Sequence, residues 1–143
     1  MTRLKKNERG AALLETAITI PMILMVCIGI FEFGRAYQTW QVLTNAAREG
    51  ARLAVIQGST DADVRARVNT YLTGGGLTSL GDDRIILTRN RPLTGTDTAS
   101  VIQVNYPFDF LYLNPVVRLV TPNSTTGQDQ ITMTSSAIMR NEM

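Results

Sequence analysis

Histidine is absent from this chain of 143 residues, and cysteine occurs once, as Cys27. Without histidine the chain lacks the commonest general base and the commonest metal ligand. A single cysteine excludes an intrachain disulfide. Asp82 and Asp83 are adjacent acids, but they and the other acids nearby lack the spacing of a calcium-binding loop. The sequence therefore predicts a protein that is not an enzyme and that holds neither a metal nor a cofactor.

Net charge is small, at +2, and basic residues crowd only at the N-terminus. The first nine residues contain one acid, Glu8, and four bases: Arg3, Lys5, Lys6 and Arg9. This cluster is too short, and flanks an apolar segment too plainly, to predict a nucleic-acid partner. A basic flank marks the cytoplasmic side of a membrane segment. We therefore expect residues 1–10 to be a cytoplasmic leader and the rest of the chain to be sent outward.

A long apolar run occupies residues 11–34. As a helix it would span roughly 36 Å, against roughly 30 Å of bilayer hydrocarbon. Its two charged residues, Glu15 and Glu32, stand near its ends, where a charge costs least. We predict a transmembrane helix over residues 11–34, in contact with membrane lipid.

Pro21 lies in the middle of this run. It removes one backbone hydrogen bond, so we expect a kink or a loosened turn there. Thr16 and Thr19 are close enough in sequence to cover the carbonyl that Pro21 frees.

Gly10, Ala11 and Glu15 form the pattern of a type IV prepilin: a basic leader, a glycine, four small or apolar residues, a glutamate and an apolar helix. A membrane peptidase needs a residue without a side chain at the cut, and Gly10 provides it. Cutting would leave Ala11 as a charged amino terminus. The Glu15 carboxylate would then pair with that amine on a neighbouring subunit and set the register between packed helices.

The same residues also have an ordinary interpretation. Gly10 is then a linker residue at the membrane surface, and Glu15 simply favours the positive end of the helix dipole. The short pattern alone does not separate these two hypotheses.

Beyond Gly34 the apolar periodicity stays helical, with spacings of four and three. The predicted stripe comprises Phe33, Tyr37, Trp40, Thr44, Ala47, Ala51 and Ala54. Tyr37 and Trp40 suit the membrane interface, and Ala47 and Ala51 allow another element to approach closely. We predict one continuous helix over about residues 11–57, with Tyr37, Trp40, Ala47 and Ala51 as its packing residues.

Two blocks of this helix resemble the TadE-like family, the pseudopilins of the tight-adherence (Tad, or Flp) pilus system. They are Phe-Glu-Phe-Gly-Arg at 31–35 and Leu-Thr-Asn-Ala-Ala-Arg-Glu-Gly-Ala-Arg at 43–52. Arg9, Gly10 and Glu15 match the family's opening, while Thr16 stands where Tad-type pilins typically carry an aromatic. The resemblance covers about residues 9–56. It implies a bacterial envelope protein for pilus assembly, matured by a prepilin peptidase and in contact with other pilin-like subunits.

The remaining residues predict a small domain. Thr60 and Asp63 form a capping box that opens a second helix, which ends near Leu72 before three glycines. Its predicted apolar face is Val64, Val68, Tyr71 and Leu72. Strands are predicted at residues 84–89, 100–106 and 130–139, forming an antiparallel sheet with one face covered by helices.

Residues 107–121 are the most apolar stretch outside the membrane run, and Pro107 and Pro115 interrupt them. They fill the core between helix and sheet, or they form an exposed surface for another subunit. In the second case, residues 108–112 are a candidate ligand-binding face.

Together these features predict an α+β fold: a long N-terminal transmembrane helix continuing into an extracytoplasmic domain, residues 35–143, with a second helix and a three-stranded antiparallel sheet. The predicted function is a pilin-like subunit or assembly component of a Tad pilus, cut between Gly10 and Ala11. It would cross the inner membrane once, with its N-terminus in the cytoplasm. The alternatives are an uncleaved envelope scaffold and a membrane-tethered ligand-binding domain.

Overall fold

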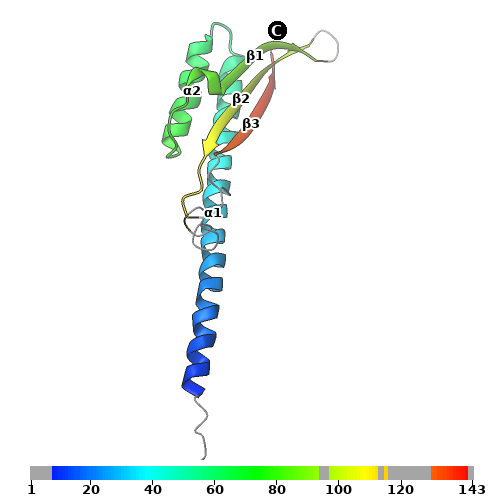
Figure 1. Cartoon of the computed structure of the whole chain (residues 1–143). Helices are drawn as coiled ribbons and strands as arrows, with labels where there is room; N and C mark the ends of the chain where they lie inside the picture. Colours follow the sequence, from blue (N-terminus) through cyan, green and yellow to red (C-terminus); the bar gives the residue numbers. More distant parts are fainter. Residues whose placement is uncertain (1–7, 94–96, 113–114, 116–129, 142–143) are drawn as a thin grey trace, which may run out of the picture. The chain divides into compact units, whose positions relative to one another are not determined.

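A computed structural model describes residues 8–93, 97–112, 115 and 130–141 of the chain. The elements, in order, are α1 (Glu8–Ala54), α2 (Asp61–Gly74), the 3-10 turn η1 (Asp82–Arg84), β1 (Ile85–Pro92), β2 (Thr98–Phe108) and β3 (Ile131–Arg140) (Figure 1). Two helices and a three-stranded antiparallel sheet make up these residues. The predicted α+β fold is confirmed.

The chain forms two compact units. The first comprises Met1–Gly34 and Phe110–Gln128, and the second comprises Arg35–Asp109 and Asp129–Met143. The N-terminal part of α1 therefore belongs to the first unit, and its C-terminal part belongs to the second. The sheet and α2 lie wholly in the second unit.

α1 begins at Glu8 and ends at Ala54, so it starts and stops three residues before the predicted bounds. It passes through Pro21. Thr16 and Thr19 each donate their hydroxyl to the carbonyl four residues earlier, at 2.8 and 2.7 Å. Pro21 has no backbone N–H group to donate to the carbonyl of Ala17, four residues before it. The threonines thus bind other carbonyls than the one we expected, because a hydroxyl reaches back along its own turn.

α2 is closed at both ends by local sequence. At its start, the Asp63 backbone N donates to Thr60 Oγ1 at 3.2 Å, and Asp63 Oδ2 accepts from the Thr60 backbone N at 3.0 Å. This is the predicted capping box. At its end, Gly76 has a φ of 80°, and the Leu77 backbone N donates to the carbonyl of Leu72 at 2.9 Å. This six-to-one bond with a left-handed glycine is a Schellman motif, which needs no tertiary contact.

The sheet has the order β1-β2-β3, and both pairings are antiparallel. Ile85 of β1 lies opposite Val104, and Phe108 of β2 lies opposite Ile131. The register between β1 and β2 shifts at a bulge, where Asn90 has a φ of 55°. Asparagine is among the residues that tolerate this left-handed backbone best.

β2 continues through Pro107 to Phe108, whereas the sequence predicted that the strand ends before the proline. Proline lacks the N–H group that a central strand must donate. Pro107 escapes this restriction because the pairing with β1 ends at Val104, so β2 has only β3 beside it at Pro107.

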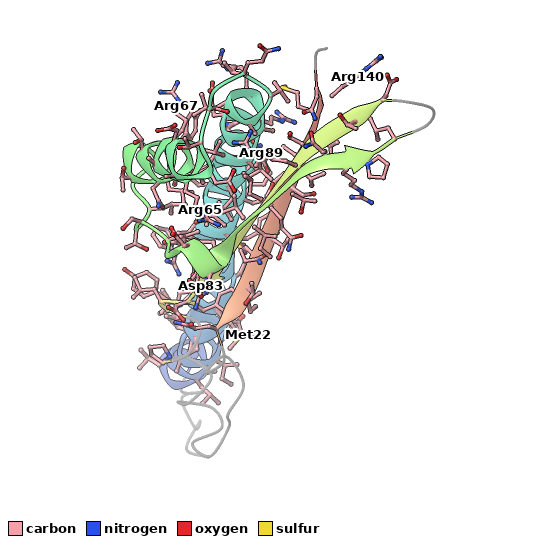
Figure 2. All side chains as sticks on the ribbon, turned by 90° about the horizontal axis from the view of Figure 1, so that it is seen from above. Met22, Arg65, Arg67, Asp83, Arg89 and Arg140 are labelled. Carbon is pink, nitrogen blue, oxygen red and sulfur yellow. The ribbon has the colours of Figure 1, made fainter. Side chains whose placement is uncertain are left out.

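Both helices pack on one face of the sheet within the second unit (Figure 2). The buried core between them is formed by Leu43, Ala46, Ala47, Ala51 and Ala54 of α1, Val64, Val68 and Leu72 of α2, Leu80, and Ile85, Ile102 and Val104 of the sheet. Tyr71 was predicted to belong to the buried face of α2, but its side chain is 38% exposed.

Candidate functional site

The N-terminal part of α1 presents a long exposed apolar surface. Its most apolar 18-residue window has a mean hydropathy of 2.2, and none of that window is buried within the chain. Within the part of the chain that the structure describes, α1 is the one helix long and apolar enough to cross a membrane. Leu13, Met22 and Ile30 are each more than half exposed. Such a surface needs lipid or another apolar partner, and we interpret it as a membrane anchor.

Gly10 and Ala11 lie in the first turn of α1, and both are exposed. The sequence placed the start of the helix after the expected cut, so the structure extends it across this peptide bond. The first four N–H groups of a helix have no partner inside it, and glycine is about 1 kcal/mol less favourable than alanine in a helix. This turn therefore opens at little cost.

Glu15 is exposed one turn beyond Ala11. Residues four apart lie on the same face of a helix, so Ala11, Glu15 and Thr19 follow one line along α1. The hydroxyl of Thr19 donates to the backbone carbonyl of Glu15 and leaves the carboxylate uninvolved in that bond. The helix thus presents the Glu15 carboxylate on the same side as Ala11, the first residue of the apolar segment.

Tyr37 and Trp40 remain outside the core of the second unit. Their side chains are 53% and 46% exposed, and their ring centroids lie 6.2 Å apart. The residues of α1 that turn inward at this level are Thr39 and Leu43, which are 5% and 0% exposed. At this level the predicted stripe therefore lies on a different side of α1 from the buried residues. Apolar periodicity alone does not distinguish a face packed in the core from a face that contacts another apolar environment. As packing residues, Tyr37 and Trp40 remain candidates only for a contact outside this subunit.

Ala47 and Ala51 are buried, with exposed fractions of 0% and 1%. Gly50 lies between them, and a Cβ atom placed there would come within 2.6 Å of Val68 Cγ2. The small residues of α1 thus permit the close approach of α2 and the sheet. The sequence prediction named the two alanines and overlooked the glycine, although it lies in the same block.

Glu32 is a functional candidate that the sequence interpretation passed over. Its residue is only 3% exposed, and its Oε1 atom accepts a hydrogen bond from the backbone N of Tyr112. The ring of Phe31 meets the ring of Tyr112 edge-on, with centroids 5.4 Å apart and an angle of 72° between the planes. The available signal was a carboxylate inside an apolar run, which marks a functional position by default.

Arg35, in the second unit, was overlooked as well. Its guanidinium donates to the carbonyl of Asp109 and lies 4.6 Å from the centre of the Phe108 ring. Phe108 itself is 3% exposed. A cation over an aromatic face is favourable, so Arg35 holds the end of β2 against α1 and covers Phe108.

A titrating group occurs at the start of α2. The Thr60 hydroxyl, which hydrogen-bonds the carboxylate, and the Thr60 backbone N–H together lower the pKa of Asp63 below its ordinary value of 3.8. No group of three or more acids and cysteines within metal-binding reach exists among the described residues.

Comparison with known proteins agrees with this description. Residues 10–52 match the family model described as TadE-like protein. No curated protein and no solved structure matches the chain. The matched segment contains Gly10, Glu15 and both blocks on which the resemblance was based. The resemblance is therefore confirmed over residues 10–52, where the chain is similar to TadE-like proteins.

Proposed function

We propose that the chain is a pilin-like structural subunit or assembly component of a Tad pilus, matured by a prepilin peptidase between Gly10 and Ala11. The observation that carries this proposal is the TadE-like match over residues 10–52, on a helix apolar enough to cross a membrane. The basic residues before Gly10 would stay in the cytoplasm, and the domain that begins near Arg35 would lie outside.

The chemistry of cutting depends on Gly10. A side chain at this position would have to enter the peptidase site with the scissile bond, and glycine has none. The first turn of α1 must also open, which the unpartnered N–H groups of that turn allow. Gly10→Leu adds bulk and helix propensity together, so both effects oppose cutting.

After cutting, the new amine of Ala11 and the carboxylate of Glu15 would govern assembly. A carboxylate exposed on an apolar helix carries a large desolvation cost unless a positive group pairs with it. The amine of an adjacent subunit would provide that group only at one axial offset between the helices. The pair would therefore determine register more than it adds stability.

The ligand-binding alternative loses support at one end of the face proposed for it, although Leu111 and Tyr112 at the other end are exposed. Phe108 is buried, and the Arg35 guanidinium lies over its ring. An uncleaved envelope scaffold remains the competing function, since it needs the same anchor and the same domain.

N-terminal sequencing of the protein purified from membranes tests the proposal. We expect the mature chain to begin at Ala11 in cells with a working peptidase. Gly10→Leu should keep the leader, whereas Glu15→Gln should be cut normally but enter pili several-fold less than the parent protein. A parent protein that begins upstream of Ala11 would leave the scaffold as the function.

A further inference from the structure

The carboxylate of Glu32 holds a backbone segment against the apolar part of α1. Its Oε1 atom accepts from the backbone N of Tyr112, eighty residues away in sequence. Both residues belong to the first unit. This hydrogen bond joins the backbone of Tyr112 to α1 and so fixes where Tyr112 lies along the helix.

Large apolar side chains gather at this contact. Phe31 and Leu111 are each 56% exposed, and Tyr112 is 45% exposed. Beside them is a hollow of about 300 Å³, lined by Leu24, Cys27, Ile28, Phe31 and Tyr112. No lining residue is charged. This surface continues directly into the exposed apolar surface of α1.

The length of the helix places this contact at a membrane boundary. From Ala11 to Phe31 a helix rises about 30 Å, which matches the thickness of bilayer hydrocarbon. If Ala11 lies at the inner edge of the hydrocarbon, Glu32 lies at the outer edge. Tyrosine is enriched at that depth because its ring is apolar and its hydroxyl is polar. A backbone N–H at that depth needs a partner, and Glu32 provides one for Tyr112.

We propose that Leu111 and Tyr112 form a second membrane contact, inserted into the outer lipid interface of the bilayer that α1 crosses, with Glu32 as the positioning residue. The inference rests on the proposed membrane anchoring and goes beyond it. We assign lipid as the partner of Leu111 and Tyr112 for two reasons. Their surface is continuous with the lipid-facing surface of α1, and the hollow beside Tyr112 is lined by uncharged residues. The segment that follows β2 therefore returns to the membrane surface.

Fluorescence quenching in proteoliposomes tests this with the full chain. Trp40→Phe removes the single tryptophan, and Tyr112→Trp then places one probe at the contact while keeping the backbone N–H. We expect lipids brominated near the headgroup to quench this probe several-fold more than lipids brominated near the bilayer centre. Iodide in the buffer should quench it weakly. The matched control is Tyr71→Trp in the same background, because Tyr71 is 38% exposed on α2; iodide should quench this probe, and brominated lipid should not.

The positioning role of Glu32 is tested in the same background. Glu32→Ala should reduce quenching by brominated lipid at least about two-fold, whereas Glu32→Gln should retain it, because the amide oxygen still accepts the Tyr112 N–H. Unchanged quenching in Glu32→Ala would overturn the role of Glu32.

Two further outcomes would overturn the lipid contact. A probe at position 112 that iodide quenches as strongly as the control is in water, and a probe shielded from both quenchers is covered by protein. Resistance of each variant to alkaline extraction from the vesicles reports the anchor separately. A retained anchor with an iodide-accessible probe would therefore contradict this inference and leave the proposed function standing.

Discussion

The guanidinium of Arg89 in β1 closes the C-terminal end of α1: Nη1 donates to the carbonyl oxygen of Ala54 at 2.7 Å. Nη2 donates to the carbonyl of Ser59 at 3.0 Å, and Nε donates to Asp61 Oδ1 at 2.7 Å. The last carbonyls of a helix lack partners within it, and a positive charge is favourable there. One side chain thus joins the end of α1, the connecting turn and the start of α2 to the sheet.

Removing these donors should destabilise the second unit. We expect Arg89→Met to lower the free energy of unfolding by about 2 kcal/mol, since charged hydrogen bonds are lost at a partly buried site. Chemical denaturation of the full chain in detergent micelles, followed by circular dichroism, measures this. Arg91→Met on the same strand is the control, because Arg91 is exposed, and it should change the value by less than about 0.5 kcal/mol. Equal effects in both variants would contradict the role assigned to Arg89.

Gly50→Ala should also destabilise the chain, although alanine is the better helix former by about 1 kcal/mol. The added Cβ would lie 2.6 Å from Val68 Cγ2 and 3.4 Å from Ile102 Cγ2. Overpacking of this kind costs about 1–3 kcal/mol, so the net loss should be about 1 kcal/mol. The same denaturation measurement applies.

Two controls accompany this substitution. Gly34→Ala on the same helix meets no atom within 4 Å, so it should not lower stability. Val68→Ala in the Gly50→Ala background removes the clashing methyl groups, so the two changes together should cost less than the sum of their separate effects. Strict additivity would show that the contact is not the cause.

Ala47→Glu tests the buried face of α1. Ala47 is fully buried, and an unpaired charge there should cost about 3 kcal/mol or more. Arg48→Glu places the same side chain one residue later, on an exposed position, and should leave the fold intact. Resistance of the domain to protease distinguishes the two variants. A protease-resistant Ala47→Glu protein would mean that this face of α1 is not packed against the sheet.

The capping box predicts a pH dependence at the start of α2. The pKa of Asp63 is lowered in the folded chain, first by the Thr60 hydroxyl and then by the Thr60 backbone N–H. A carboxyl whose folded pKa is depressed contributes stability above its unfolded pKa and loses it as the pH falls through the folded value. The stability difference between the parent chain and Asp63→Ala should therefore be full at neutral pH and shrink below about pH 4.

Nuclear magnetic resonance titration of the Asp63 side chain provides the direct measurement. We expect a pKa below 3.8 in the parent chain and a return toward 3.8 in Thr60→Val, which keeps the shape of the side chain but removes the hydroxyl. An Asp63 pKa that is the same in both proteins would contradict this assignment.

Local sequence determined most of the secondary structure. The apolar run and the periodicity after it predicted α1 to within three residues at each end, and Thr60 with Asp63 predicted the start of α2. A short apolar run at residues 85–87 predicted β1, and alternation of apolar residues predicted β2 and β3. These features depend on neighbours a few residues apart, so they can be read from a single sequence. The TadE-like resemblance also rests on contiguous blocks.

Tertiary structure decided which face of α1 is buried and which hydrogen bonds the charged residues of the chain form. Periodicity alone placed Tyr37 and Trp40 on the packed stripe, whereas Thr39 and Leu43 face the core. The tertiary bonds of Glu32 and Arg89 reach eighty and thirty-five residues along the chain, respectively. The sequence lists these charged residues, but only the folded backbone brings a particular carbonyl or N–H group within hydrogen-bond distance of them. Their roles follow from spatial proximity, which no local pattern encodes.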